Sequence, residues 1–240
     1  VHKTKYINET KRVSFKYDGK NYFGYEGDTL ASALLANGVH LIGRSFKYHR
    51  PRGIMSCGSE EPNAICQISD KNDLTEPNVR ATELEIYDGL EAFSQNCWPN
   101  VKFDIGGINN LISPLIPAGF YYKTFMWPKS FWKKVYEPLI RMSAGLGKSP
   151  TEPDPDIYEH KYVHCDVLVI GAGIAGIMSA KTAAKNGFKT ILVEEKPYLG
   201  GSTIIQNSNF YKINNQISGS WLEKEINEIK KLDNLEIKTR

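Results

Sequence analysis

Apolar and polar positions alternate with a period of two near the start of the chain, which predicts a β-hairpin. Residues 12–17 alternate in the manner of a strand, and residues 21–24 provide the returning strand. Asp18 and Gly19 lie between them and are typical of a tight turn. An antiparallel pair of strands is therefore expected to open the fold.

A short helix and further strands are expected after this hairpin. Residues 29–36 are rich in Leu and Ala, Asp28 precedes them as a candidate N-cap, and Asn37-Gly38 can end the helix in a left-handed conformation. Apolar alternation predicts later strands at 64–68 and 82–87. Together these elements favour a β-grasp domain like that of plant-type ferredoxins, which concerns the fold and not the function.

The pattern changes near residue 165, where a strand, a glycine-rich turn and a helix follow one another. A strand is expected at 165–170 and a helix at 177–186, closed by Gly187, with a second strand at 189–194. The turn between the first strand and the helix reads Gly171-Ala172-Gly173-Ile174-Ala175-Gly176. This G-x-G-x-x-G spacing in a strand–turn–helix–strand context is the dinucleotide-binding fingerprint.

Each position of the fingerprint has a physical role. Gly171 allows a tight turn out of the strand, Gly173 lets a pyrophosphate approach the backbone, and Gly176 lets the helix pack closely on the sheet. The helix N-terminus offers free amides and a positive dipole to the phosphates. Glu194 ends the second strand, where a carboxylate accepts from ribose hydroxyls and repels the 2′-phosphate of NADP. A degenerate unit that keeps the shape and binds nothing is the alternative.

The chain is expected to divide into three parts. Residues 1–90 form the ferredoxin-like β-grasp domain, residues 91–160 an aromatic-rich connecting segment with a Pro-rich linker, and residues 161–240 a Rossmann dinucleotide-binding domain. Ser220 is a candidate cap for a helix, and a strand is expected at 235–238. A doubly wound sheet needs more strands than these, so the Rossmann domain is expected to be incomplete and the chain, which begins at Val1, a fragment.

Two further stretches can be interpreted either as structural elements or as binding sites. The loop 43–53 carries four cations with interleaved aromatic residues, and a solvated loop paired with Glu60 and Glu61, or a protein interface, is favoured over a phosphate or nucleic-acid contact. Residues 120–136 contain eight aromatic side chains, for which interdomain packing or an interface is favoured over a ligand site.

Composition narrows the class of protein. Charged residues make up 24% of the 240 residues, hydrophobic residues 41%, and the net charge is +3, which is ordinary globular composition and gives no support for a nucleic-acid partner. No apolar run is long enough to span a bilayer, so a cytoplasmic protein without a membrane partner is expected. The four cysteines form no C-x-x-C pair and indicate neither a zinc site nor a disulfide framework.

Three segments outside the fingerprint make the chain resemble a known family, the α subunits of heterotetrameric sarcosine oxidase. They are residues 27–39, the basic loop 43–53 and residues 117–128. The resemblance covers nearly the whole chain. It implies a part of a flavoenzyme that oxidises the N-methyl group of sarcosine to give glycine, hydrogen peroxide, and formaldehyde or methylenetetrahydrofolate.

The resemblance also implies cofactors and partners. The complex would contain β, γ and δ subunits, with FAD in the β subunit, FMN between α and β, tetrahydrofolate in a distant part of α, and NAD in the Rossmann domain of this chain. The NAD site would use Gly171, Ala172, Gly173, Ile174, Ala175, Gly176, Glu194, Glu195, Lys196, Gly200, Gly201 and Ser202. No catalytic residue is carried over, because the amine-oxidising site belongs to another subunit.

The chain differs from relatives of its N-terminal domain in the cysteines that could bind an iron–sulfur cluster. Relatives of the N-terminal domain in amine and opine dehydrogenases hold a [2Fe–2S] cluster through closely spaced cysteines, whereas this stretch contains only Cys57 and Cys66. A ferredoxin-like fold without a cluster is therefore expected. The alternatives to the oxidase subunit are a related amine, opine or dimethylglycine dehydrogenase subunit, against which this departure speaks, and a non-catalytic scaffold module.

Overall fold

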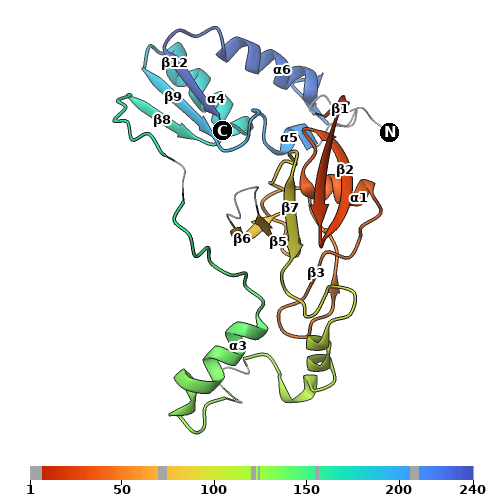
Figure 1. Ribbon diagram of the computed structural model, residues 1–240. Coiled ribbons are helices and arrows are strands. Elements are labelled where there is room, and N and C mark those ends of the chain that lie inside the picture. Colours follow the sequence, from red (N-terminus) through yellow and green to blue (C-terminus); the bar gives the residue numbers. More distant parts are fainter. Residues whose placement is uncertain are drawn as a thin grey trace. The chain divides into compact units, whose positions relative to one another are not determined.

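The computed structural model describes residues 7–69, 75–119, 123, 125–154, 157–205 and 211–239 (Figure 1). The chain forms two compact units, Val1–Asp156 and Ile157–Arg240. None of the helices in the described ranges is both long enough and apolar enough to cross a membrane.

A five-stranded mixed sheet forms the centre of the first unit, in the order β2-β1-β7-β5-β6. The hairpin pairs β1 with β2 antiparallel around the turn at Asp18-Gly19, and β7 runs parallel to β1. A separate two-stranded ribbon is formed by β3 and β4. The strands are β1 (Asn8–Tyr17), β2 (Lys20–Glu26), β3 (Gly43–Arg44), β4 (Pro51–Arg52), β5 (Ile65–Ser69), β6 (Thr75–Arg80) and β7 (Leu90–Ser94).

Helix α1 (Leu30–Ala36) covers this sheet and supplies much of its core. Leu30, Ala33 and Leu34 are fully buried, and they belong to one cluster with Phe15 of β1 and Leu90 of β7. This combination of sheet and helix is the ferredoxin-like β-grasp arrangement that the sequence predicts.

Residues 82–87 do not form the strand that was expected. The Leu84 carbonyl instead accepts the Leu30 amide at the start of α1, and the carbonyl of Ala81, just before this stretch, accepts the Ala31 amide. These tertiary bonds satisfy helix N-terminal amides that have no partner within the helix. Thr29 is the N-cap residue in place of Asp28, whose carboxylate accepts the Ser32 hydroxyl at 2.7 Å and the Tyr25 amide at 3.0 Å.

Short helices follow the sheet in the rest of the first unit. They are the 3-10 helices η1 (Ile105–Asn110) and η2 (Ser113–Leu115), the one-turn π-helix η3 (Trp132–Tyr136) and α3 (Glu137–Ser143). None of the residues described in these elements is buried.

The second unit contains a three-stranded parallel sheet in the order β12-β9-β8, with α4 packed on it and α6 against α4. Its core contains Ile177 of α4, Leu192 of β9 and Leu222 and Ile229 of α6. The elements are β8 (Val167–Ile170), α4 (Ile174–Lys185), β9 (Thr190–Glu194), α5 (Ser202–Ile205), β10 (Lys212–Ile213), β11 (Gln216–Ile217), α6 (Ser218–Ile229) and β12 (Leu235–Thr239). The parallel strands joined by a crossover helix form the Rossmann-type unit that the fingerprint predicts.

Candidate functional site

The fingerprint turn joins β8 directly to α4. Gly171 adopts a φ of +92°, a left-handed conformation that favours glycine, and its amide bonds to the Val193 carbonyl at 2.7 Å. A methyl group on Gly176 would overlap the Gly171 carbonyl oxygen, so that the helix and the turn approach as closely as they do only because Gly176 has no side chain. This close approach fixes the start of α4 against the end of β8.

Gly173 differs from Gly176 because space is open around it. A Cβ atom added to Gly173 would meet no heavy atom within 4 Å, and its φ of −67° is accessible to any residue. Gly173 is also the N-cap of the twelve-residue α4, where the amides of the first turn have no carbonyl partner within the helix. The missing side chain therefore leaves room for a phosphate group next to free amides and the positive end of the helix dipole.

A second glycine turn lies against the first. The Gly200 amide bonds to the Ala172 carbonyl at 2.8 Å, and a Cβ on Gly201 would come within 3.1 Å of the Gly173 Cα. Ser202 follows at the first position of α5 and is exposed. Two turns that are almost thirty residues apart are thus brought together at the N-terminus of α4.

Glu194 ends β9 beside the fingerprint turn and is 9% exposed. One oxygen of its carboxylate accepts the Ala172 amide at 2.6 Å and the other accepts the Lys196 amide at 3.1 Å. Each carboxylate oxygen has a second lone pair, so both can still accept hydroxyl groups of a ligand. Glu195 is exposed and Lys196 is half-buried.

The twelve residues expected to form the site are all described, and they occupy the turn after β8, the end of β9 and the 200–202 turn. The Gly200–Ala172 bond and the Glu194–Ala172 bond link these three places directly. Ile174 and Ala175, both exposed, lie in the first turn of α4. Chemically, the arrangement offers amides for phosphate and a carboxylate for hydroxyl groups.

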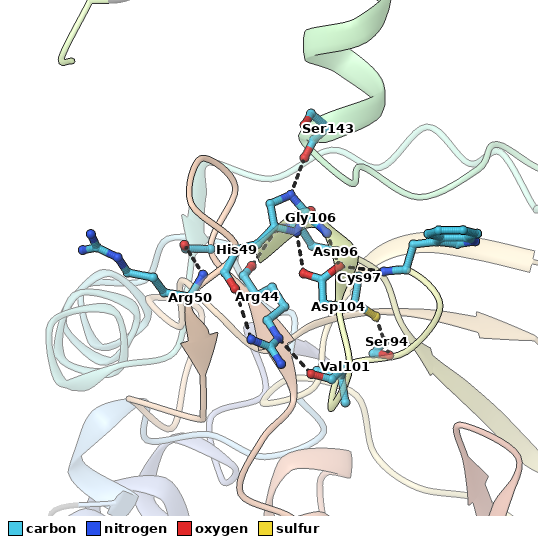
Figure 2. Close-up of polar contacts among 12 residues, drawn as sticks. Arg44, His49, Arg50, Ser94, Asn96, Cys97, Val101, Asp104, Gly106 and Ser143 are labelled. Atoms are coloured by element: carbon cyan, nitrogen blue, oxygen red, sulfur yellow. Dashed lines mark hydrogen bonds and ion pairs between the residues drawn. The ribbon is translucent and has the colours of Figure 1, made fainter. Parts of the chain in front are cut away.

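Arg44 and Arg50 of the basic loop donate hydrogen bonds to the segment after β7, and Figure 2 shows the bond from Arg44 to the Val101 carbonyl. Arg44 donates to the carbonyls of Val101 at 2.8 Å and Lys102 at 3.0 Å, and Arg50 donates to the Asn110 side chain at 2.9 Å. These contacts attach the segment after β7 to the loop. The Glu61 carboxylate instead accepts four backbone amides, those of Met55, Ser56, Asn63 and Ala64.

The aromatic stretch 120–136 is only partly described, because Phe120, Tyr121 and Tyr122 lie outside the described residues. Among its other members, Tyr136 contacts the rings of Phe125 and Phe131. Trp127 is 83% exposed. The described side chains therefore pack on one another locally and leave Trp127 in solvent.

Two family models match the chain. Residues 10–97 match the 2Fe-2S iron-sulfur cluster binding domain, and residues 166–238 match FAD dependent oxidoreductases. The matched ranges coincide with the ferredoxin-like sheet and with the Rossmann-type unit, which confirms the fold class expected from the sequence.

Three curated relatives that are similar to almost the whole chain are all sarcosine oxidase α subunits. Sarcosine oxidase subunit alpha of Rhizobium meliloti is 50% identical over 98% of this chain, and those of two Corynebacterium strains are 29% and 30% identical over 90% and 93%. The chain spans 23% of the length of the first relative and 18% of each of the other two. The crystal structure of L-proline dehydrogenase from P. horikoshii matches 97% of the chain with a TM-score of 0.58 at 20% identity, and the chain covers 34% of it. That likeness concerns the fold.

The family matches disagree with two cofactor expectations from the sequence, the absence of an iron–sulfur cluster and the presence of NAD. The expectation that the N-terminal domain has no iron–sulfur cluster is wrong, because its residues match the family of [2Fe–2S] cluster binding domains. The expectation of NAD in the Rossmann-type unit is likewise not supported, since the family matched there is FAD dependent.

The cysteines, as placed, do not supply the four thiolates that such a cluster takes. Cys57 is exposed, Cys66 is fully buried in β5, and Cys97 lies 3.3 Å from the Ser94 hydroxyl. Burial raises the pKa of the Cys66 thiol to about 12 and also raises the pKa of Cys97. Within the described ranges, no three His, Cys, Asp or Glu side chains are grouped so that they could hold a metal ion. We therefore assign no electron-transfer step to a cluster in this chain.

Proposed function

Because the chain is a homologue of sarcosine oxidase α subunits over 98% of its residues, we propose that it is the dinucleotide-binding part of such a subunit. In this proposal residues 161–240 bind the dinucleotide and residues 1–90, together with the rest of β7, form the ferredoxin-like domain, so that the connecting segment expected at 91–160 begins after Ser94. The observation that carries the proposal is the open space at Gly173, next to the free amides of α4 and within a unit of the FAD dependent oxidoreductase family.

The dinucleotide is FAD in this proposal. The amides of the first turn of α4 and the backbone of the 200–202 turn would hold its pyrophosphate, next to the space that Gly173 leaves open. The Glu194 carboxylate, already fixed by the Ala172 and Lys196 amides, accepts the hydroxyls of the adenosine ribose. Bound flavin supplies the capacity to accept a hydride from an amine substrate. This chain's residues hold and orient its adenosine half.

The reaction proposed for the complete enzyme is the oxidative demethylation of sarcosine. Sarcosine, oxygen and water give glycine, formaldehyde and hydrogen peroxide: the C–N bond of the methyl group is oxidised to an imine, water hydrolyses the imine, and oxygen takes the two electrons. Partner subunits named β, γ and δ complete the enzyme. The four free cysteines suit the reducing cytoplasm in which we place it.

The experiment that tests the reaction uses the full-length α subunit purified with its partner subunits. Peroxide and formaldehyde are measured with sarcosine, dimethylglycine, an opine and L-proline as substrates. The proposal predicts the highest kcat/KM for sarcosine and equal amounts of the two products. A preference for dimethylglycine or the opine, with no peroxide formed, would instead support the dehydrogenase alternative.

A further inference from the structure

The segment 98–148, which we call the arm, leaves the sheet after β7 and is fixed to the ferredoxin-like domain near both of its ends. Near its start, Arg44 donates to the Val101 carbonyl at 2.8 Å. Near its end, the Gly147 amide donates to the side-chain oxygen of Asn78 in β6 at 3.3 Å. Polar contacts with the domain therefore position the arm.

One side of the helical stretch formed by η3 and α3 is apolar and exposed. Four apolar side chains recur at intervals of four, four and three residues, which places them on one side of a helix. They are Phe131, Val135, Leu139 and Met142, and they are between 37% and 75% exposed. The charged side chains of this stretch lie at other positions of the helix, where Arg141 pairs with Glu137. The arm thus presents an amphipathic helix whose apolar stripe is open to solvent.

The 3-10 helix η1 carries a second apolar stripe. Side chains three residues apart align in a 3-10 helix. The aligned apolar residues of η1 and its C-cap are Ile105, Ile108 and Leu111, and they are between 47% and 79% exposed. The start of η1 and the end of α3 lie close together, because the His49 ring is 2.6 Å from the Asp104 carboxylate and 3.2 Å from the Ser143 carbonyl. The two stripes therefore belong to neighbouring elements.

Stripes of this kind are typical of a contact surface. Single apolar side chains on a surface need no partner, whereas contiguous apolar surface marks an interaction site. The cover of such a surface is itself apolar, since a polar group placed there would lose its water without gaining a hydrogen-bond partner. The two stripes of the arm therefore fit an apolar protein segment.

We propose that the two stripes of the arm bind the part of the α subunit that follows residue 240. The inference rests on the proposed function, in which this chain is part of a sarcosine oxidase α subunit. The chain spans 23% of the length of the Rhizobium meliloti relative, so most of a subunit of that length lies outside this chain. A segment of the same polypeptide also meets the stripes at a much higher effective concentration than a separate protein does.

Photocrosslinking of the full-length α subunit, purified with its partner subunits, tests which chain covers the stripes. Leu139 is replaced by p-benzoylphenylalanine, the complex is irradiated, and the crosslinked peptides are identified by mass spectrometry. We expect crosslinks to residues beyond 240, in a product that keeps the mass of one α subunit. Crosslinks to a partner subunit, to a second α subunit or to residues 157–240, or no crosslinks at all, would overturn the proposal.

Oxidation of Met142 measures the cover without a change of sequence. Met142 is 75% exposed in this chain, and dilute hydrogen peroxide converts exposed methionine to its sulfoxide. In the full-length complex, Met142 should be oxidised at least about tenfold more slowly than in the same protein unfolded in urea. Equal rates in the folded and unfolded proteins would contradict the proposal.

Two variants show whether the apolar stripe itself makes the contact. Leu139→Glu places a charge within the stripe and should raise the oxidation rate of Met142 toward its unfolded value. Lys133→Glu changes an exposed residue of the charged side and should leave the rate low. The same rate in both variants would count against docking through the stripe.

Peroxide formation with sarcosine, measured in separate samples of the wild-type complex, keeps this inference distinct from the proposed function. A complex that does not oxidise sarcosine contradicts the proposed function. The crosslinks decide what covers the arm, whichever amine the complex oxidises.

Discussion

Glu61 organises the loop before β5, and replacing it tests how the ferredoxin-like domain is stabilised. The side chain is 1% exposed. Its Oε2 accepts the amides of Met55 at 2.7 Å and Ser56 at 2.6 Å, and its Oε1 accepts those of Asn63 at 2.8 Å and Ala64 at 3.2 Å. One carboxylate therefore accepts hydrogen bonds from both ends of the ten-residue loop 55–64.

The Glu61→Gln variant keeps the shape of the side chain but turns one acceptor oxygen into an NH₂ group. Two backbone amides would then face a donor and lose their partners, at roughly 1–3 kcal/mol each, so we expect a loss of about 4 kcal/mol in the free energy of unfolding. The measurement is native-state hydrogen exchange of the β5 amides as a function of urea. Glu76→Gln, an exposed residue of β6, is the matched control and should change stability by less than about 0.5 kcal/mol.

The effect of Glu61→Gln should depend on pH. Burial alone would raise the pKa of the Glu61 carboxyl, but the four amide bonds hold it below its ordinary value. The stabilisation is then complete above the unfolded pKa of about 4.3 and is lost as the pH falls through the lower folded pKa. The free energies of unfolding of wild type and variant should therefore become more similar as the pH is lowered. A loss below about 1 kcal/mol at neutral pH, or a difference that grows in acid, would refute the reasoning.

Three more predictions concern other parts of the chain. Gly176→Ala should distort the fingerprint turn and lower the melting temperature of the Rossmann-type unit in calorimetry, whereas Gly107→Ala, where a Cβ meets nothing within 4 Å, should leave melting unchanged. Lys181→Met leaves the buried Glu225 without its ion pair and should destabilise the unit by about 3 kcal/mol in urea, whereas the exposed Lys185→Met should not. An equal loss of stability in Lys181→Met and Lys185→Met would show that the burial of the Lys181–Glu225 ion pair does not matter for stability. Iodoacetamide should modify the exposed Cys57 before the buried Cys66, whose pKa is about 12, and mass spectrometry of peptides gives the order.

The Rossmann-type unit could be predicted closely because its signals are local. The strand, the fingerprint glycines, the helix and the second strand follow one another within about thirty residues, and the structure places β8, α4 and β9 there. Ser220 was expected to cap the last helix, but α6 already begins at Ser218, after Ile217, which makes no side-chain cap bond. Boundaries of this kind depend on one or two residues.

The strands of the first unit were harder to predict because they depend on distant partners. Leu84 and Ile86 alternate like a strand, yet their backbone bonds to the start of α1 and to Asp28. Strand β6 was missed, and it contains Pro77, which a strand tolerates at the edge of a sheet, where β6 lies.

The two buried polar sites of this unit had no sequence signal. Glu61 accepts amides of its own loop, whereas the ring of the buried His49 contacts Asp104 and the Ser143 carbonyl, which lie 55 and 94 positions away in the sequence. Such a charged or polar group can be buried only where several donors or acceptors converge on it. That convergence exists only after the chain has folded, so neither role could be read from spacing.

The nucleotide content of the full-length protein, purified with its partners, tests the proposed dinucleotide site most directly when wild type is compared with Gly173→Val. The site at Gly173 has room for a side chain, so the variant should fold with an unchanged melting temperature of the apo unit and should lose the dinucleotide. Because partner subunits can carry flavin of their own, the count that matters is the difference between the two proteins after denaturation, chromatography and mass analysis. We predict one equivalent of FAD fewer per α subunit in Gly173→Val. Equal dinucleotide content in the two proteins would contradict the proposed site, and the loss of a different dinucleotide would contradict the choice of FAD.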